Sequence, residues 1–465
     1  MKKLMLYFQC ILIIQVFSFS TVFSKNLVQN PGFEAQGQSP QYWTITGPVS
    51  TMQPSTSVDG NYKYEGSASL KMESTNINCH GRAVQLVDVE GGVTYLFSAQ
   101  FMTKNVSSID KSVMIRIKWL KGNQNLGYHY IYEIESEANG WSQASNKIKA
   151  LPLATSAEIS LEFRWTTGVI WWDNISMENC PELSPRKTNV GTVYFRPPGP
   201  TVEKNIALMG DLLDQAGKAH CQIICLPEGW TTSNTGIGMQ KNEVNTIDGS
   251  ASRMLSQKAK QYGMYIVSGL YTWTGDTLHN IAALYDRQGI IQSIYKKVHL
   301  PDSEAESGAV PGNSLPVFNT DFGKIGILIC WDYAFPEVSR ALALKGAEIL
   351  FCPIAGDVRG TDIYKIISRS RAVDNGVYFV NSIFDGHSMI INPAGDILQE
   401  SGTQGTLLMA TIDLNFSPSW DWIGNEGRGD WKGVWRKDRR PDIFEEIGKY
   451  ATSSNSDQGV PNKNK

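Results

Sequence analysis

Three short apolar segments in the second half of the chain each stop at an ionisable residue. The segment "CQIICLPE" ends at Glu228, "IIQSIYKK" ends at Lys297, and "GKIGILIC" ends at Cys330. Short apolar runs that are bounded by Gly, Pro or charged residues predict buried β-strands. The chain therefore presents a glutamate, a lysine and a cysteine, in that order, each at the end of a predicted strand.

The segment after Cys330 changes character within a few residues. Pro336 followed by "EVSRALALKGA" predicts a helix whose first turn carries a proline and an acid, so Cys330 is expected at a strand-to-helix turn. One interpretation of Cys330 is a buried structural thiol, since free cysteine is among the most buried residue types. The corresponding interpretation of Glu228 is a helix cap or an ion-pair partner, and Lys297 would be that partner.

Taken together, the three residue types at strand ends indicate a site of chemistry. A thiolate is the attacking species, a nearby lysine stabilises it, and a carboxylate within reach takes its proton and returns it to the leaving amine. The backbone N–H of Trp331, directly after the cysteine, is the expected second donor to the tetrahedral oxyanion, beside Lys297. This chemistry needs no metal or other cofactor.

Three motifs, "LPEGW", "YKKVHLP" and "GILICWDYAFPE", closely resemble the three signatures of the nitrilase, or carbon-nitrogen hydrolase, superfamily. The resemblance spans Asn189 to Phe444. It implies an αββα sandwich that brings the nucleophile Cys330, the general base Glu228 and the cation Lys297 into one pocket. It also implies that the base later acts as the general acid.

The resemblance implies supporting residues and a quaternary structure as well. Family members place a second glutamate beside the lysine, before a Pro-Gly turn, and in "PDSEAESGAVPG" we expect it to be Glu306, with Glu304 as the rival. His299 is expected to support the lysine loop. Members commonly pair through the helices that follow the cysteine and the next strand, here near residues 336–346 and 362–375, so a homo-oligomer is expected.

The residues after the cysteine indicate the substrate class. "CWDYAFPE" followed by "ALKGAEILFCP" looks most like the N-carbamoylputrescine amidohydrolase branch, which favours a small-molecule amide or carbamoyl substrate. Relatives that take N-carbamoyl amino acids place an arginine shortly after the cysteine to hold the substrate carboxylate, whereas Tyr333, Ala334 and Phe335 stand here. Two other function classes stay open: an exported glycan-binding protein with an inactive hydrolase scaffold, and a thioester-based acyltransferase.

The first half of the chain has a different texture. Over residues 26–179, short strands rich in aromatic and β-branched residues alternate with Gly, Asn and Ser clusters, which predicts a β-sandwich. "NLVQNPGFE", "GSASLKM" and "GVIWWDNISM" resemble the jelly-roll carbohydrate-binding modules of secreted enzymes. The resemblance implies a glycan ligand and a structural calcium ion on Glu34 and Asp173, with solvated strand-end carboxylates as the alternative. The candidates for stacking on sugar rings, each with core packing as the alternative, are Trp43, Tyr62, Tyr64, Trp119, Tyr128, Tyr130 and Trp141.

The rest of the chain is organised around these two domains. Residues 180–187 predict a linker, residues 188–450 an α/β domain, and residues 451–465 a polar, disordered tail. Residues 1–24, with a basic start and an apolar centre, predict a signal peptide and export, with an uncleaved membrane anchor as the alternative. The 42 Lys and Arg residues against 45 Asp and Glu leave a net charge of −3 without a basic block, so no nucleic-acid partner is expected.

Overall fold

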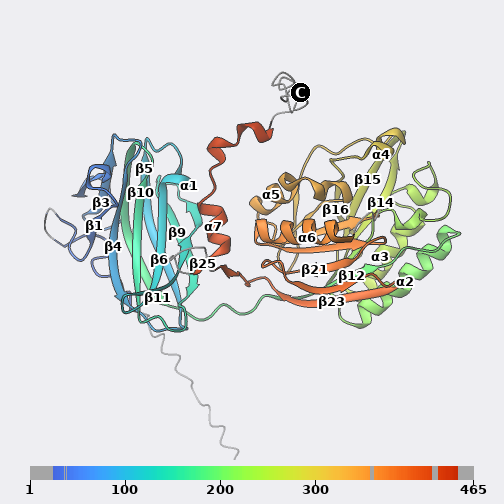
Figure 1. Ribbon diagram of the computed structural model, residues 1–465, viewed down its shortest axis with the longest axis horizontal. Helices are drawn as coiled ribbons and strands as arrows, with labels where there is room; N and C mark the ends of the chain where they lie inside the picture. Colours follow the sequence, from blue (N-terminus) through green and yellow to red (C-terminus); the bar gives the residue numbers. More distant parts are fainter. Residues whose placement is uncertain (1–24, 36, 38, 357–360, 421–427, 449–465) are drawn as a thin grey trace, which may run out of the picture.

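The computed structural model describes residues 25–448 apart from residues 36, 38, 357–360 and 421–427. The predicted signal peptide and polar tail therefore lie outside the described residues. An all-β domain comes first and an α/β domain follows (Figure 1). Within the described part of the chain, no helix has the length and apolar character needed to cross a membrane.

The first domain consists of two sheets packed face to face, as a β-sandwich requires, and the strands within residues 44–179 pair antiparallel. The seven-stranded sheet has the order β1 (Thr44–Thr46), β4 (His80–Asp88), β10 (Ser156–Arg164), β6 (Val113–Lys121), β7 (Gln124–Ile131), β25 (Arg428–Asp430) and β24 (Ser419–Trp420). The six-stranded sheet has the order β2 (Ser55–Asp59), β3 (Ser69–Ser74), β11 (Gly168–Asn179), β5 (Thr94–Lys104), β9 (Ser142–Lys149) and β8 (Glu133–Ser136). A short helix, α1 (Ile109–Ser112), precedes β6. The β-sandwich prediction is confirmed at this level, while the jelly-roll assignment stays a prediction.

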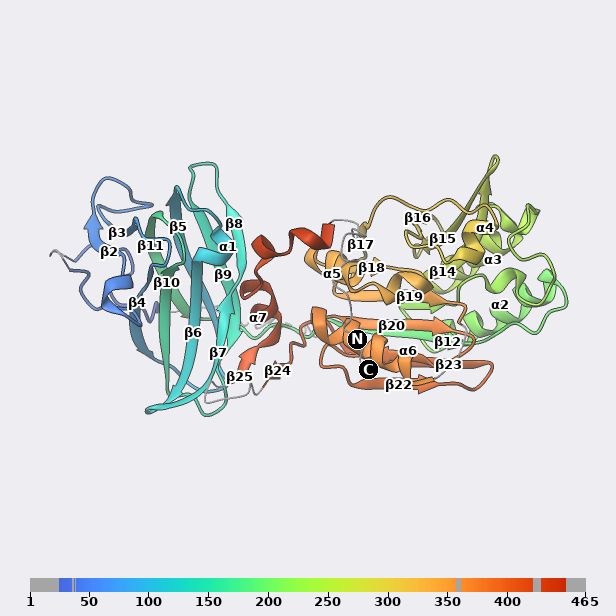
Figure 2. The ribbon, with the colours of Figure 1, turned by 45° about the horizontal axis from the view of Figure 1, so that its top comes forward.

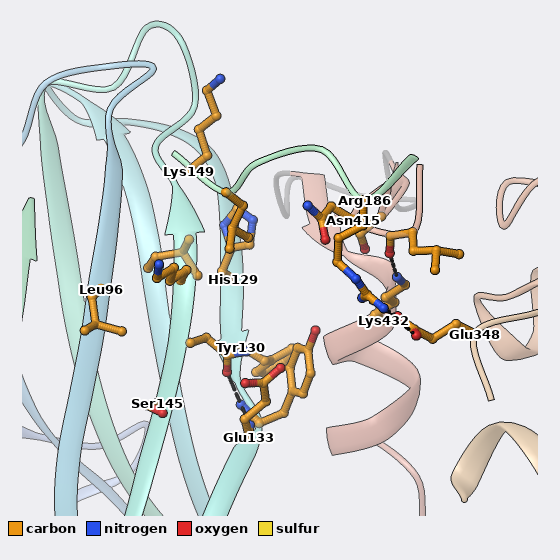
Figure 3. A pocket seen from close by; sticks show the side chains of 17 residues that line it. Leu96, His129, Tyr130, Glu133, Ser145, Lys149, Arg186, Glu348, Asn415 and Lys432 are labelled. Carbon is orange, nitrogen blue, oxygen red and sulfur yellow. Dashed lines mark hydrogen bonds and ion pairs between the residues drawn. The ribbon is translucent and has the colours of Figure 1, made fainter. Parts of the chain in front are cut away.

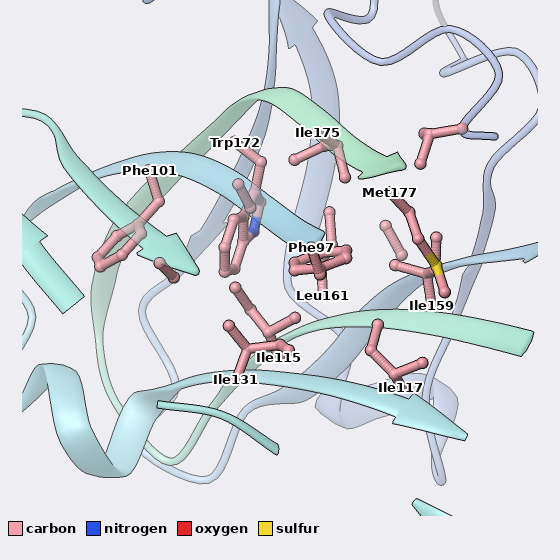
Figure 4. Close-up of a cluster of buried hydrophobic side chains, with 14 of the residues drawn as sticks. Phe97, Phe101, Ile115, Ile117, Ile131, Ile159, Leu161, Trp172, Ile175 and Met177 are labelled. Atoms are coloured by element: carbon pink, nitrogen blue, oxygen red, sulfur yellow. The ribbon is translucent and has the colours of Figure 1, made fainter. Parts of the chain in front are cut away.

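Alternation along the strands builds the core of this sandwich. In β10, Ile159, Leu161 and Phe163 are fully buried in the core cluster, and Glu162 between them points to the other face of the sheet. Figure 4 shows side chains of both sheets pointing into the same space. Each large apolar side chain that is buried there contributes about 1.5–3 kcal/mol.

The second domain has four layers, with two sheets between two helical layers. One sheet has the order β16 (Ile291–Lys296), β15 (Thr277–Tyr285), β14 (Tyr265–Thr274), β13 (Ile223–Leu226), β12 (Lys187–Tyr194) and β23 (Thr406–Asp413). The other has the order β17 (Val317–Asn319), β18 (Lys324–Ile327), β19 (Ile349–Ile354), β20 (Tyr378–Ile383), β21 (Ser388–Ile391) and β22 (Ile397–Ser401). The helices are α2 (Val202–Lys218), α3 (Ser250–Tyr262), α4 (Asp302–Glu306), α5 (Pro336–Leu344) and α6 (Thr361–Asn375).

Separate apolar clusters hold these layers together. The helices α2 and α3 share a core with the first sheet, α5 and α6 share one with the second sheet, and a third core lies between the sheets. The central strands of both sheets run parallel, so buried residues occupy both of their faces. This αββα arrangement confirms the predicted fold of the second domain.

The C-terminal segment returns to the sandwich after the α/β domain is complete. The strand β25 pairs in parallel with β7 at Gly127 and Tyr128, and so extends the seven-stranded sheet beyond the strands of residues 44–179. Helix α7 (Trp431–Lys437) lies between the two domains in both views (Figures 1 and 2). Its Trp435 packs with the α5–α6 core, while the Arg436 guanidinium lies 5.3 Å from the ring centroid of Tyr132 in the sandwich. One segment therefore contacts both domains.

Candidate active site

The three ionisable strand ends meet at one edge of the paired sheets. Glu228 follows β13, Lys297 follows β16, and Cys330 follows β18 after two further residues. β13 and β14 are parallel, and β16 runs in the same direction because it is two antiparallel steps away from β14. Carboxyl ends of parallel strands lie at the same edge of a sheet, where ligands usually bind. The strand directions therefore bring Glu228 and Lys297 to one edge of their sheet, and Cys330 from the other sheet lies beside them.

Lys297 lies at the centre of the cluster. Its side chain is fully buried, and its Nζ lies 2.8 Å from Oε1 of Glu228 and 2.6 Å from Oε1 of Glu304. Burial lowers the pKa of a lysine, but here the negative charges of Glu228 and Glu304 outweigh it and raise the Lys297 pKa. Lys297 is therefore protonated at neutral pH.

Glu228 is held from several sides. Its Oε2 accepts a hydrogen bond of 2.9 Å from the backbone N–H of Ala355, and its Oε1 accepts one of 2.6 Å from Nδ2 of Asn280. Burial alone would raise the pKa of Glu228, but the Lys297 charge and these hydrogen bonds lower it below its usual range. Burial and the nearby Glu228 charge raise the pKa of Glu304 instead. The two carboxylates that share one lysine thus differ in proton affinity.

The choice of Glu306 as the second glutamate is wrong, and the rival Glu304 occupies that position. Both lie in the five-residue helix α4, where Glu304 is buried against Lys297 and Glu306 is exposed. Residues two apart on a helix do not face the same side, so only one of the two can reach the lysine. The spacing to Pro311 in the sequence does not determine which one does.

Cys330 lies at a strained turn between β18 and a 3-10 helix, Cys330–Ala334, after which α5 begins at Pro336. Its φ of 42° is in the left-handed region that residues with a side chain rarely adopt. Burial, followed by the charge of the nearby Glu228, raises the Cys330 pKa. The resting nucleophile is therefore a neutral thiol beside a carboxylate that can take its proton.

The residues around this turn support it. The Asp332 carboxylate is fully buried and accepts hydrogen bonds from the Tyr295 hydroxyl at 2.7 Å and from the Ile329 backbone N–H at 3.0 Å. Its Oδ1 also accepts a hydrogen bond of 2.9 Å from the backbone N–H of His299, and Nδ1 of His299 lies 3.0 Å from the same Oδ1. His299 thus joins the segment after the lysine to the segment after the cysteine.

Trp331 has its side chain 47% exposed, and its backbone N–H lies in the first turn of the 3-10 helix. The first N–H groups of a helix lack intrahelical acceptors and are free to bind an anion. Its predicted role at the oxyanion stays a prediction.

The sequence reasoning missed three residues that hold this cluster together, Asn280, Tyr295 and Asp332. Tyr295 and Asp332 each lie two residues from a catalytic candidate, Lys297 or Cys330, which was a usable signal. Asn280 lies within a strand far from any motif, so its sequence context carries no such signal.

The predicted calcium ligands do not fit a cation site. Oε1 of Glu34 accepts hydrogen bonds from the backbone N–H groups of Ser67 at 2.9 Å and Ala68 at 3.2 Å. Oδ2 of Asp173 accepts one of 2.7 Å from the backbone N–H of Tyr64. These oxygens face N–H donors, which repel a cation, and Oε2 of Glu34 accepts a further hydrogen bond from the Ser67 hydroxyl. Among the residues that the structure describes, no group of three or more His, Cys, Asp or Glu is placed to hold a metal ion.

A cavity of about 710 Å³ lies between the sandwich and the α/β domain, away from this cluster (Figure 3). The sandwich lines it with His129, Tyr130 and Glu133, and the other side includes Arg186 and Lys432. The Arg186 side chain there is engaged by an ion pair of 2.6 Å with Glu348. None of the three catalytic candidates lines this cavity.

Comparison with known proteins agrees with this site and fold. The family model described as "Carbon-nitrogen hydrolase" matches residues 191–421. An omega-amidase NIT2 from Danio rerio is 30% identical over 232 residues, which cover 46% of this chain and 83% of the relative. An omega-amidase NIT2-A from Xenopus laevis is also 30% identical, with coverage of 47% and 86%.

The fold is similar to that of a solved carbon-nitrogen hydrolase from Helicobacter pylori G27. The TM-score is 0.50 at 24% identity, over 57% of this chain and 99% of that one, so the likeness concerns the fold. The α/β domain is thus that of a hydrolase acting on carbon-nitrogen bonds. The chain belongs to the carbon-nitrogen hydrolase family of the nitrilase superfamily and is an enzyme.

Proposed function

We propose that this enzyme hydrolyses the carbon-nitrogen bond of an amide or an N-carbamoyl amine through a thioester on Cys330. The observation that carries the proposal is the buried Lys297, which lies between Glu228 and Glu304 beside a cysteine at a strained turn. Burying charged groups is costly to stability, which favours a functional reason for this cluster, and strongly shifted pKa values are typical of active sites.

The first half of the reaction makes the thioester. Because the pKa of the Cys330 thiol is raised, Glu228 takes its proton as the sulfur attacks the substrate carbonyl. The oxyanion that forms receives hydrogen bonds from Lys297 and from the backbone N–H of Trp331. Glu228 then gives its proton to the leaving nitrogen, the C–N bond breaks, and ammonia or an amine departs.

The second half returns the enzyme to its starting state. Water attacks the thioester carbonyl, and Glu228, again ionised, accepts a proton from it. The tetrahedral intermediate collapses with cleavage of the C–S bond. The acid product leaves, and the sulfur regains its proton from Glu228. No oxidant, reductant or metal enters either half.

The substrate class follows from the relatives and from the residues near the turn. The similar proteins are named omega-amidases, which supports an amide. Tyr333, Ala334 and Phe335 follow the cysteine in place of an arginine, which disfavours a substrate with a free α-carboxylate. The narrower assignment to the N-carbamoylputrescine branch rests on "CWDYAFPE".

The test is ammonia release from primary amides, N-carbamoyl amines, N-carbamoyl amino acids and nitriles, with Cys330→Ala beside the wild type. Cys180→Ala, which removes a partly exposed thiol at the end of the sandwich, is the matched control. We expect release from amides or carbamoyl amines that the first variant abolishes and the second retains. If no compound of the panel releases ammonia and mass spectrometry finds no acyl adduct on Cys330, the proposal is contradicted. An adduct that an added amine discharges would indicate acyl transfer.

Glycan binding by the sandwich stays a proposal and now rests mainly on Tyr62. This side chain is 44% exposed and its ring lies 4.6 Å from that of the buried Trp171. Four other aromatic candidates are buried and cannot stack on a sugar, namely Trp43, Trp119, Tyr130 and Trp141. A substrate amide linked to a glycan is the corresponding hypothesis, and binding of a glycan array by the protein tests it.

Export and self-association also stay proposals. The apolar centre of residues 1–24 supports export. Ile363 and Ile366 of α6 are 57% and 65% exposed, which supports pairing of two copies through this helix. Trp435 of α7 packs against the layer formed by α5 and α6. A second copy would therefore bind the part of this layer that Trp435 does not cover. Sedimentation of the wild type beside Ile366→Lys measures the oligomeric state.

A further inference from the structure

Asn280 occupies a central place in the cluster that the proposed mechanism does not use. It lies in β15 and is 1% exposed. Its Nδ2 lies 2.6 Å from Oε1 of Glu228 and 3.2 Å from Oε2 of Glu304. Its backbone carbonyl accepts a hydrogen bond of 2.9 Å from the backbone N–H of Lys297. One residue thus contacts all three members of the buried charge cluster.

The chemistry of a carboxamide determines how Asn280 can act here. Ionised carboxylates only accept hydrogen bonds, so the group between Glu228 and Glu304 must be a donor, and only the nitrogen of the carboxamide donates. Its Oδ1 has no hydrogen-bond partner in the part of the chain that the structure describes. An unsatisfied buried acceptor has a cost, so the two bonds to the carboxylates determine the orientation of this side chain.

The charge balance of the cluster explains why a second donor matters. Glu228 and Glu304 carry two negative charges when both are ionised, while Lys297 supplies one positive charge. Hydrogen bonds to a charged carboxylate favour its ionised form. Asn280 contributes one of the bonds that lower the pKa of Glu228, and it also donates to Glu304.

We propose that Asn280 is a positioning residue of the hydrolase, whose amide nitrogen holds Glu228 and Glu304 so that Glu228 is the ionised base beside Cys330. This inference rests on the proposed function, since it assigns the base of that reaction. A polar residue that only supports the core would affect the stability of the fold when it is removed. Removal of Asn280 is expected to change the proton affinity of Glu228 as well.

The experiment compares Asn280→Ala and Asn280→Asp with the wild type. Asn280→Asp has nearly the same shape but replaces the donor by a third carboxylate. The matched control is Asn245→Asp, because Asn245 is also buried and donates two hydrogen bonds from Nδ2, and its Oδ1 has no partner among the described residues. Its acceptors are backbone carbonyls of Gly238 and Gln240, so it does not touch the charge cluster.

Two pH profiles are measured for each variant: kcat/KM on the best amide, and the rate at which iodoacetamide alkylates Cys330. We expect the acid limb of both profiles to move to higher pH by about one pH unit in Asn280→Ala and further in Asn280→Asp. We expect kcat to fall at least about 10-fold at neutral pH with a smaller change in KM. Asn245→Asp is expected to keep the wild-type acid limb.

If the folded Asn280→Ala variant keeps the wild-type acid limb in both pH profiles, the inference is wrong, whatever the activity of the variant. If both variants lose their fold by circular dichroism, Asn280→Ser, which is smaller and retains one donor, carries the same test with an intermediate shift expected. The alkylation profile separates the two proposals. A shifted alkylation limb in a protein that hydrolyses no amide retains the role of Asn280 and refutes the amide substrate.

Discussion

Glu304 and Glu306 form a natural pair for testing the site, because they lie two residues apart and only one of them faces the lysine. In Glu304→Gln the glutamine oxygen can still accept from Lys297, but its nitrogen then faces Nδ2 of Asn280, donor against donor, where the wild-type distance is 3.2 Å. The charge that balances Lys297 at 2.6 Å is also lost. Glu306→Gln removes the same charge from an exposed position.

The expected magnitude follows from the buried ion pair. A hydrogen bond between charged groups contributes about 1.5–3 kcal/mol, which corresponds to about 10–150-fold in rate if it is lost in the transition state. We therefore expect kcat/KM for amide hydrolysis to fall by that factor in Glu304→Gln and to stay within about 2-fold of the wild type in Glu306→Gln. Thermal unfolding of both variants shows whether the fold is retained.

The reasoning is refuted if the folded Glu304→Gln variant keeps its wild-type kcat/KM. It is equally refuted if Glu306→Gln loses as much activity as Glu304→Gln, because the exposed residue makes no contact with Lys297. If KM rises while kcat is unchanged, Glu304 instead contributes to substrate binding and not to the positioning of Lys297.

Two further predictions concern stability. Glu162 is buried in the sandwich with His80, Arg116 and Arg164 around it; burial opposes ionisation, but these partners lower its pKa to about 2. Because the folded pKa lies below the usual value, the ionised group stabilises the fold above about pH 4.5, and about 3 kcal/mol is lost as the pH falls toward 2. Urea unfolding between pH 6 and pH 2 should therefore be less pH-dependent in Glu162→Gln, and equal slopes would contradict this. Trp435→Ala should cost about 3–5 kcal/mol and separate the unfolding of the two domains into two calorimetric transitions, whereas one unchanged transition would show that α7 does not couple them.

Several features of the site follow from local sequence alone. The apolar runs before Glu228, Lys297 and Cys330 predict strands because hydrophobic patterning within a few residues determines which segments are buried. Pro336 and the acid after it predict the start of α5, and the structure begins that helix at Pro336. The order of the three motifs also sufficed to indicate the fold of the second domain and the reaction class.

Other features depended on which residues face each other across the fold. Glu304 and Glu306 are equivalent in the sequence, and only the direction of a short helix relative to Lys297 separates them. Asn280 resembles any polar residue of a strand until two carboxylates from distant segments are placed against it. The carboxylates of Glu34 and Asp173 matched calcium ligands in the sequence, but the backbone N–H groups of a neighbouring loop occupy them.

The C-terminal segment shows the same division. Its many Trp and Arg residues do not by themselves show what the segment contacts. In the structure, β25 extends the sheet edge at β7, and α7 contacts both domains. The sequence by itself determined the elements and the chemical groups, because these depend on local patterns. The tertiary structure decided which groups become partners, because burial and charge pairing join residues that are up to hundreds of positions apart.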